Sequence, residues 1–135
     1  MRLKHKLREG VAAVEFAILL PFLAFMFVVA VDWCRVFYYS ITVTNCARNG
    51  ALYASDPIGQ AASPYTSVTD AALADASNLS PTPTVASLTA ADSNGSYVEV
   101  TVSYHFQTLT NFPGVPSSNT VARTIRMYVA PRTPN

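Results

Sequence analysis

The chain has 135 residues and a formal net charge of +1; half of its residues are hydrophobic and 13% are charged. This length allows one small domain beyond any membrane segment. The arginines beyond the first apolar run are scattered and form no basic patch, which argues against a nucleic-acid binder.

The charges are unevenly placed along the chain. Four basic residues crowd the stretch that precedes the first apolar run: Arg2, Lys4, Lys6 and Arg8. Beyond Val31 the charges are sparse and nearly balanced. By the positive-inside rule, residues 1–10 are a cytoplasmic basic leader, and everything after Asp32 is exported.

An almost unbroken apolar run extends from Gly10 to Asp32, with one carboxylate, Glu15, and one proline, Pro21. As a helix, residues 11–31 would rise roughly 31 Å, which matches the hydrocarbon core of a bilayer. The run therefore predicts a single transmembrane helix over residues 11–31. We interpret Pro21 as a helix kink, which membrane helices tolerate.

Two ordinary interpretations of this run compete with a functional one. The first is a signal peptide, with Val28 and Ala30 as the small residues of a cleavage site ahead of Val31. Against it, the run is longer than a usual signal-peptide core and contains a carboxylate. The second is a plain single-pass anchor in which Glu15 is incidental. An acidic side chain inside a spanning helix is costly, however, and is seldom found there without a partner.

The functional interpretation is a prepilin-type cleavage between Gly10 and Val11. Val11 would become a new amino terminus, with Glu15 as its fifth residue. The new ammonium group and the carboxylate would each be costly among packed apolar helices, and pairing between neighbouring subunits would compensate both. A glycine at the cut lets a protease approach the backbone closely.

These residues carry a resemblance to a known family. The stretch REGVAAVEFAILLPFLAFMFVV resembles the amino terminus of TadE-like proteins, the pseudopilins of the tight-adherence (Tad/Flp) type IV pilus system. The family's motif, a glycine followed by apolar residues and a Glu-aromatic pair, falls on Gly10, Glu15 and Phe16. One departure is Glu9, which stands where the family commonly has a basic residue directly before the glycine.

The resemblance continues past the membrane run, as far as Pro57. The segment CARNGALYA, residues 46–54, occupies the family's Ala-Ala-Arg-x-Gly-Ala-x-Tyr-Ala position. The resemblance implies that Gly10, Val11, Glu15 and Phe16 are the cleavage and recognition residues. It implies that Glu15 and Val11 act in assembly.

In function, the resemblance implies a minor pilin-like structural subunit that assists assembly of a Tad-type pilus. Its partners would be membrane lipid, a prepilin peptidase, other pilin or pseudopilin subunits and the pilus assembly machinery. Its place would be the bacterial cytoplasmic (inner) membrane, with the amino terminus cytoplasmic and the carboxy-terminal domain outside, or the pilus itself. The alternative is an unprocessed single-pass anchor that displays an extracytoplasmic adhesion or complex-forming domain.

Residues 32–56 are predicted to continue the helix outside the membrane until Pro57 and Gly59 stop it. A narrow polar strip runs along this part, and the rest of its circumference is apolar or small. Such a wide apolar face must be covered by the chain's own domain or by neighbouring subunits. On one helix Cys34 and Cys46 lie about 18 Å apart, too far for a disulfide, and we interpret both as small packed thiols.

Residues 57–135 are predicted to form an exported α+β domain. Its elements are a connector at 56–67, a helix at 68–79 capped by Thr69, strands at 84–90, 97–106 and 120–130, a turn at 92–96, a loop at 108–119 that wraps one sheet edge, and a frayed tail at 131–135. The last strand places Arg123 on its inward face, near a sheet end or a carboxylate. The fold expected is pilin-like: a long amino-terminal helix packed on a small antiparallel sheet.

The sequence offers no enzymatic site. It contains no glycine-rich phosphate loop, zinc-ligand spacing or nucleophile elbow. The bilayer would separate the two histidines, His5 and His105, and we expect His105 to be a solvated strand residue. We therefore expect no catalysis, no cofactor, no metal and no small-molecule substrate.

Overall fold

The computed structural model describes residues 3–109 and 117–131. Three helices and three strands follow one another in these ranges: α1 Leu3–Ser55, α2 Gly59–Ala62, α3 Val68–Leu73, β1 Thr84–Asp92, β2 Gly95–Gln107 and β3 Ser118–Tyr128. The predicted edge-wrapping loop and the carboxy-terminal tail fall largely outside the described residues, as do the side chains of the basic leader.

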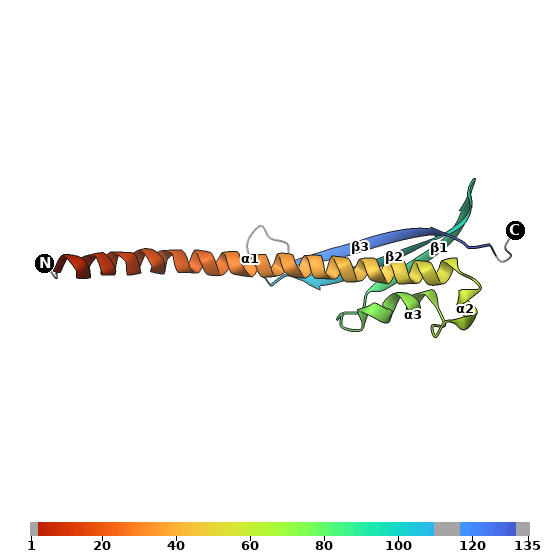
Figure 1. The fold of residues 1–135 in the computed structure, drawn as a ribbon, viewed down its shortest axis with the longest axis horizontal. Coiled ribbons are helices and arrows are strands. Elements are labelled where there is room, and N and C mark those ends of the chain that lie inside the picture. The colour runs from red at the N-terminus through yellow and green to blue at the C-terminus, as the bar shows by residue number, and fades with distance from the viewer. Residues whose placement is uncertain (1–2, 110–116, 132–135) are drawn as a thin grey trace.

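Helix α1 is the axis of the molecule. It runs for 53 residues, and Figure 1 shows its first half extending alone while its second half carries the rest of the chain. The predicted continuation of the membrane helix to Ser55, just ahead of Pro57, is confirmed. The helix begins earlier than predicted, at Leu3, because an established helix readily propagates into flanking residues that have no competing structure.

Pro21 lies inside α1 without ending it. Figure 1 shows the ribbon continuing in nearly the same direction on both sides of this part of the helix, so any bend there is gentle.

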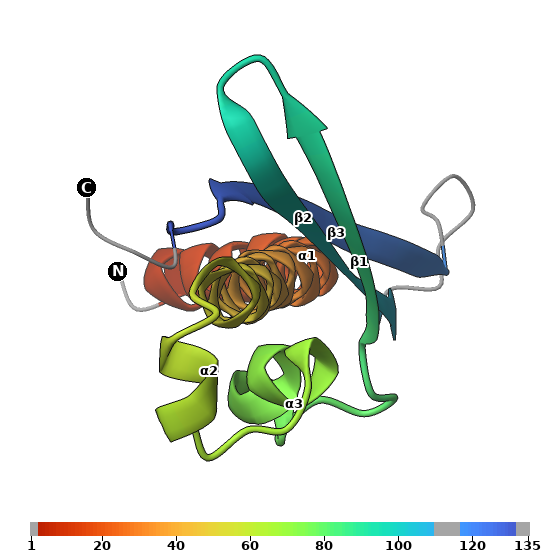
Figure 2. The same ribbon diagram turned by 90° about the vertical axis from the view of Figure 1, so that its right-hand side faces the viewer.

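The sheet is three-stranded and antiparallel in the order β1-β2-β3, which confirms the predicted α+β class. Strand β2 alternates as predicted. Its inward side chains are buried against α1: Val98, Val100, Val102, Tyr104 and Phe106. Figure 2 looks along α1 and shows the sheet crossing one side of the helix while α3 lies on another.

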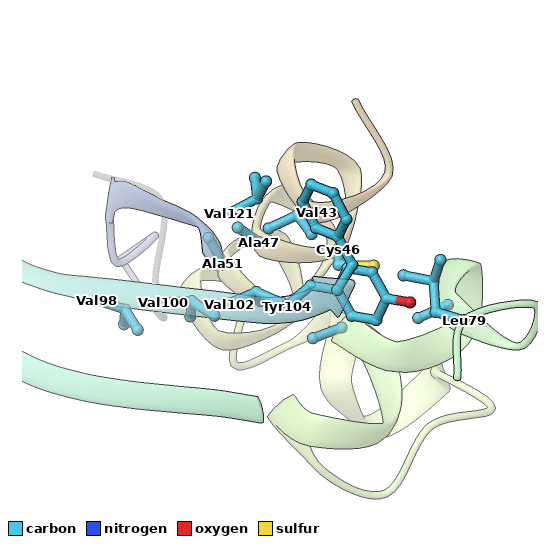
Figure 3. Close-up of a cluster of buried hydrophobic side chains, with 13 residues drawn as sticks. Val43, Cys46, Ala47, Ala51, Leu79, Val98, Val100, Val102, Tyr104 and Val121 are labelled. Carbon is cyan, nitrogen blue, oxygen red and sulfur yellow. The ribbon is translucent and has the colours of Figure 1, made fainter. Parts of the chain in front are cut away.

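The hydrophobic core gathers where α1, α3 and β2 meet (Figure 3). Helix α1 contributes mostly small side chains to it, all fully buried: Val43, Cys46, Ala47 and Ala51. Small residues on a helix allow a sheet to approach closely, and burial of each valine contributes roughly 1.5–3 kcal/mol. The chain's own domain therefore covers one side of the second half of α1.

Gly50 marks the closest approach in this core. A Cβ atom at this position would lie 3.0 Å from the Cβ of Ala72 on α3 and 3.1 Å from a methyl carbon of Val100 on β2. Any side chain would therefore require Ala72 and Val100 to give way by a few tenths of an ångström. The local sequence pattern does not indicate this tight packing.

Three local details differ from the sequence predictions. Ser67, not Thr69, caps α3, since its hydroxyl accepts a hydrogen bond from the amide of Asp70 at 3.0 Å. The helical segment also ends at Ala76, after one 3-10 turn, instead of reaching residue 79. In the hairpin the two loop residues are Ser93 and Asn94, because strand pairing already resumes at Gly95.

Arg123 does face the α1 side of the sheet, but the prediction that it meets a carboxylate or a sheet end is wrong. It lies within edge strand β3 opposite Val102, is exposed, and donates a hydrogen bond to the Oγ of Ser40 at 2.7 Å. An edge strand lets a long side chain reach past the helix to solvent. The packed-thiol interpretation holds for Cys46, which is buried, but not for Cys34, which is exposed.

We expect Gly50→Val to destabilise the α+β domain by about 1–3 kcal/mol, since the added side chain overpacks the contact with Ala72 and Val100. Thermal unfolding of the full chain in detergent micelles, followed by near-ultraviolet circular dichroism, measures this. Asn45→Val is the matched control, because it places the same β-branched residue on an exposed position of the same helix. Equal melting temperatures for the two variants would contradict the close packing at Gly50.

Candidate functional site

The first half of α1 is apolar and uncovered. Its side chains are largely exposed, including Val11 at 59%, Ile18 at 70% and Phe27 at 71%. This is the one helix, among the described residues, that is long and apolar enough to cross a membrane, and its apolar stretch is not buried in the protein. A buried core helix is thereby excluded. The surface of this segment must be covered by lipid or by other apolar helices.

The predicted cleavage residues, Gly10 and Val11, lie inside the helix and not at its start. A Cβ atom on Gly10 would meet nothing within 4 Å, so no packing within the described residues requires a glycine there. Glycine inside a helix costs about 1 kcal/mol relative to alanine. Gly10 is therefore a weak point in the helix at the position where the peptide bond would be cut.

Glu15 and Phe16 lie on the same uncovered part of α1, and both are exposed. Within the described residues Glu15 has no hydrogen-bond or ion-pair partner. It follows Val11 by four residues, and positions four apart in a helix face the same side. The structure thus places the Glu15 carboxylate about one helical turn from the proposed new amino terminus.

The point where α1 would leave the membrane is held by Asp32. Its side chain is only 7% exposed, and its Oδ1 accepts hydrogen bonds from the backbone amide of Leu109 at 2.9 Å and from Arg35 at 3.3 Å. Trp33 and Phe37 beside it are 60% and 63% exposed, as suits aromatic residues at a membrane interface. In the sequence, Asp32 stands out only as a carboxylate directly after the apolar run. Its partner, the backbone amide of Leu109 in the loop after β2, could not be predicted from the sequence.

The side of α1 that faces away from the domain keeps an exposed apolar stripe in its second half. It consists of Trp33, Phe37, Ile41 and Leu52, each 49–63% exposed. The domain therefore covers one side of this helix, and the stripe continues the uncovered surface of the membrane half.

No catalytic or metal centre emerges from the described ranges. Across residues 3–109 and 117–131, no three His, Cys, Asp or Glu side chains gather as metal ligands. His105 is exposed on β2, with its Nδ1 3.0 Å from the Thr120 hydroxyl. Burial raises the pKa of the Cys46 thiol, which keeps it protonated and unreactive.

A family comparison supports this arrangement. The family model described as TadE-like protein matches residues 10–52. The match begins at Gly10, includes the apolar first half of α1 and most of its second half, and ends before the sheet. No curated protein and no solved structure matches the chain. The match confirms the resemblance noted in the sequence: over residues 10–52 this chain is similar to TadE-like proteins.

Proposed function

We propose that this protein is a minor pilin-like structural subunit that assists assembly of a Tad-type pilus after cleavage between Gly10 and Val11. The observation that carries the proposal is the division of α1. One half is a bare apolar rod, and the other half is fixed firmly to an α+β domain. A subunit of this shape can exchange a lipid environment for neighbouring helices without unfolding its domain.

Cleavage fits the placement of the residues on α1. Hydrolysis of the Gly10–Val11 peptide bond by water leaves a carboxylate on Gly10 and an ammonium group on Val11. It removes the leader and its four basic residues, which hold the chain to the cytoplasmic leaflet. Gly10 favours the reaction because the helix is easiest to open at a glycine.

The carboxylate of Glu15 is the natural partner for the new ammonium group. A charged carboxylate inside a membrane costs roughly 2.5–3.5 kcal/mol near the centre of a helix, and an ion pair reduces this cost. Within one chain Glu15 lies a helical turn from Val11, and in an assembly it can also reach the amino terminus of a neighbour. Only the second pairing joins two subunits, and we assign that role to Glu15.

The remaining partners and the cellular location follow from this function. A prepilin peptidase cleaves the leader, other pilin or pseudopilin subunits pack on the bare half of α1, and the pilus machinery moves the subunit. Before assembly the protein is a single-pass protein of the bacterial cytoplasmic membrane, with its leader inside and its domain outside. The exposed stripe with Trp33 and Ile41 gives neighbours a further apolar contact beyond the bilayer.

The alternative function is an unprocessed anchor that displays the α+β domain for adhesion or for a membrane complex. In that case the exposed apolar helix and the uncleaved leader would hold the protein in the membrane. The amino terminus of the mature protein separates the two functions.

In cells that make pili, we expect the native protein to begin at Val11 and Gly10→Leu to keep its leader, because leucine blocks backbone approach and strengthens the helix. Intact mass and amino-terminal sequencing of the membrane fraction measure both. Ala13→Leu is the control: it adds the same side chain two residues after Val11, and we expect the Gly10–Val11 bond of this variant to be cleaved normally. A native protein beginning at Met1 would favour the anchor, and one beginning near Val31 would indicate a signal peptide.

We expect Glu15→Gln to leave expression and cleavage intact but to reduce assembled pili about tenfold or more, since a buried ion pair loses its charged partner. Pili are counted by electron microscopy, and the subunit is quantified in the membrane and sheared fractions. Glu15→Asp is the control, because it keeps the carboxylate and should retain a larger share of assembly. Normal pili with Glu15→Gln would remove the assembly role of this residue.

A further inference from the structure

A cavity that no function above uses lies beside α1, close to the point where the helix would leave the membrane. Its volume is about 470 Å³. Three segments form its wall: Arg35 and Tyr39 on α1, Ser80 and Pro81 ahead of β1, and residues 104–107 at the end of β2. The cavity therefore exists only when the domain is packed on the helix.

The base of this cavity is aromatic. The ring centroid of Tyr39 lies 4.9 Å from that of Tyr104 and 4.9 Å from that of Phe106. The Tyr104 hydroxyl donates a hydrogen bond to the backbone carbonyl of Ser80 at 3.0 Å, which ties the segment before β1 to the end of β2. The cavity thus has a rigid apolar base and a side wall held by a hydrogen bond.

Among the described residues that line the cavity, Arg35 supplies the one permanent charge. Its guanidinium contacts the Asp32 carboxylate and the Tyr39 hydroxyl, each at 3.3 Å, a long distance for a charged hydrogen bond. A guanidinium carries five N–H donors, so donors remain for a ligand. Asp32 does not line the cavity, and the Nδ1 of His105 is engaged by Thr120. The cavity therefore favours an anionic group that accepts hydrogen bonds.

The position of Arg35 on the helix indicates which anion is available. It follows Val31 by four residues, a rise of roughly 6 Å, and the headgroup layer of a bilayer is roughly 5–8 Å deep on each side. Trp33 and Leu109, both 60% exposed, lie at the same end of the domain and suit this interface. Arg35 is thus at the level of the lipid phosphates.

We propose that this cavity binds the phosphodiester group of a membrane phospholipid. Arg35 donates hydrogen bonds to the phosphate oxygens, and the aromatic base contacts the glycerol and the first carbons of the acyl chains. Bound lipid would hold the domain in one orientation on the bilayer surface. The inference rests on membrane insertion of residues 11–31 and needs neither leader cleavage nor pilus assembly.

The test uses the full-length chain in detergent micelles and the side-chain N–H signals of its arginines in NMR spectra. The probe is dihexanoyl phosphatidylglycerol, titrated against inorganic phosphate and against dihexanoylglycerol, which lacks the phosphate. We expect a saturable shift of the Arg35 signal with the phospholipid, and at least tenfold weaker binding of the other two compounds. Inorganic phosphate binding as tightly as the lipid would assign the site to a soluble phosphate and overturn the lipid proposal.

The variants locate the site. Arg35→Gln should weaken phospholipid binding at least tenfold, as loss of a charged hydrogen-bond donor predicts, measured by perturbation of the Trp33 indole N–H signal. Arg48→Gln is the matched control, because Arg48 is exposed on the same helix thirteen residues farther from the bilayer. Equal binding by the two variants would overturn the proposal.

A third variant guards against a folding defect in Arg35→Gln. Arg35→Lys keeps the positive charge without the planar guanidinium, and it should bind with intermediate affinity. If Arg35→Gln fails to fold, Arg35→Lys decides. The role of Arg35 would be contradicted if Arg35→Lys bound the phospholipid as tightly as the wild type does, or if it bound the phospholipid no more tightly than dihexanoylglycerol. The native amino terminus and the pilus count do not enter these measurements, so failure here leaves the proposed function intact.

Discussion

The structure depends on one packing contact, the fit of a small-residue face of α1 against the flat inner face of β2. Val43, Ala47 and Ala51 on the helix are fully buried, and a Cβ atom on Gly50 would make tight contacts of 3.0 and 3.1 Å. Because this face is narrow and close-fitting, the sheet can cover only one side of the second half of α1. The contact fixes the domain to one half of the rod and leaves the other half, with its apolar surface, to the surroundings.

The two halves of α1 consequently lie in different environments, although both halves are rich in apolar residues. In its second half, apolar side chains are partly covered by protein, and those that remain exposed form the stripe that runs from Trp33 to Leu52. In its first half, the apolar side chains are largely exposed. A soluble domain gains no stability from such a surface, so the apolar half is explained by association with lipid or with other helices. Under the proposed function, the subunit would use both environments in turn.

The sequence predicted features that depend on local pattern. The alternation in β2, the end of α1 before Pro57 and the α+β class are confirmed, because periodicity and helix-breaking residues act within a few positions. Features set by tertiary contacts were not accessible. Gly50 needs knowledge of two distant elements, and Asp32 needs a loop that follows β2. The exposure of Arg123 depends on β3 being an edge strand, which its own alternation cannot show.

Three charged residues of the sheet, unlike Glu15, have partners of opposite charge. On the outer face of the sheet Arg126 donates a hydrogen bond to Glu99 at 2.9 Å, lies 3.7 Å from Asp92 and covers the ring of Tyr97. A hydrogen bond from the Asn94 amide further lowers the pKa of Asp92. The chain thus pairs exposed charges in water, where each pair contributes little. Within the described residues it leaves Glu15 unpaired in an apolar segment, where a partner matters most. Glu15 has no partner among the described residues and lies beside the proposed new amino terminus, which fits the proposal that its partner arrives with assembly.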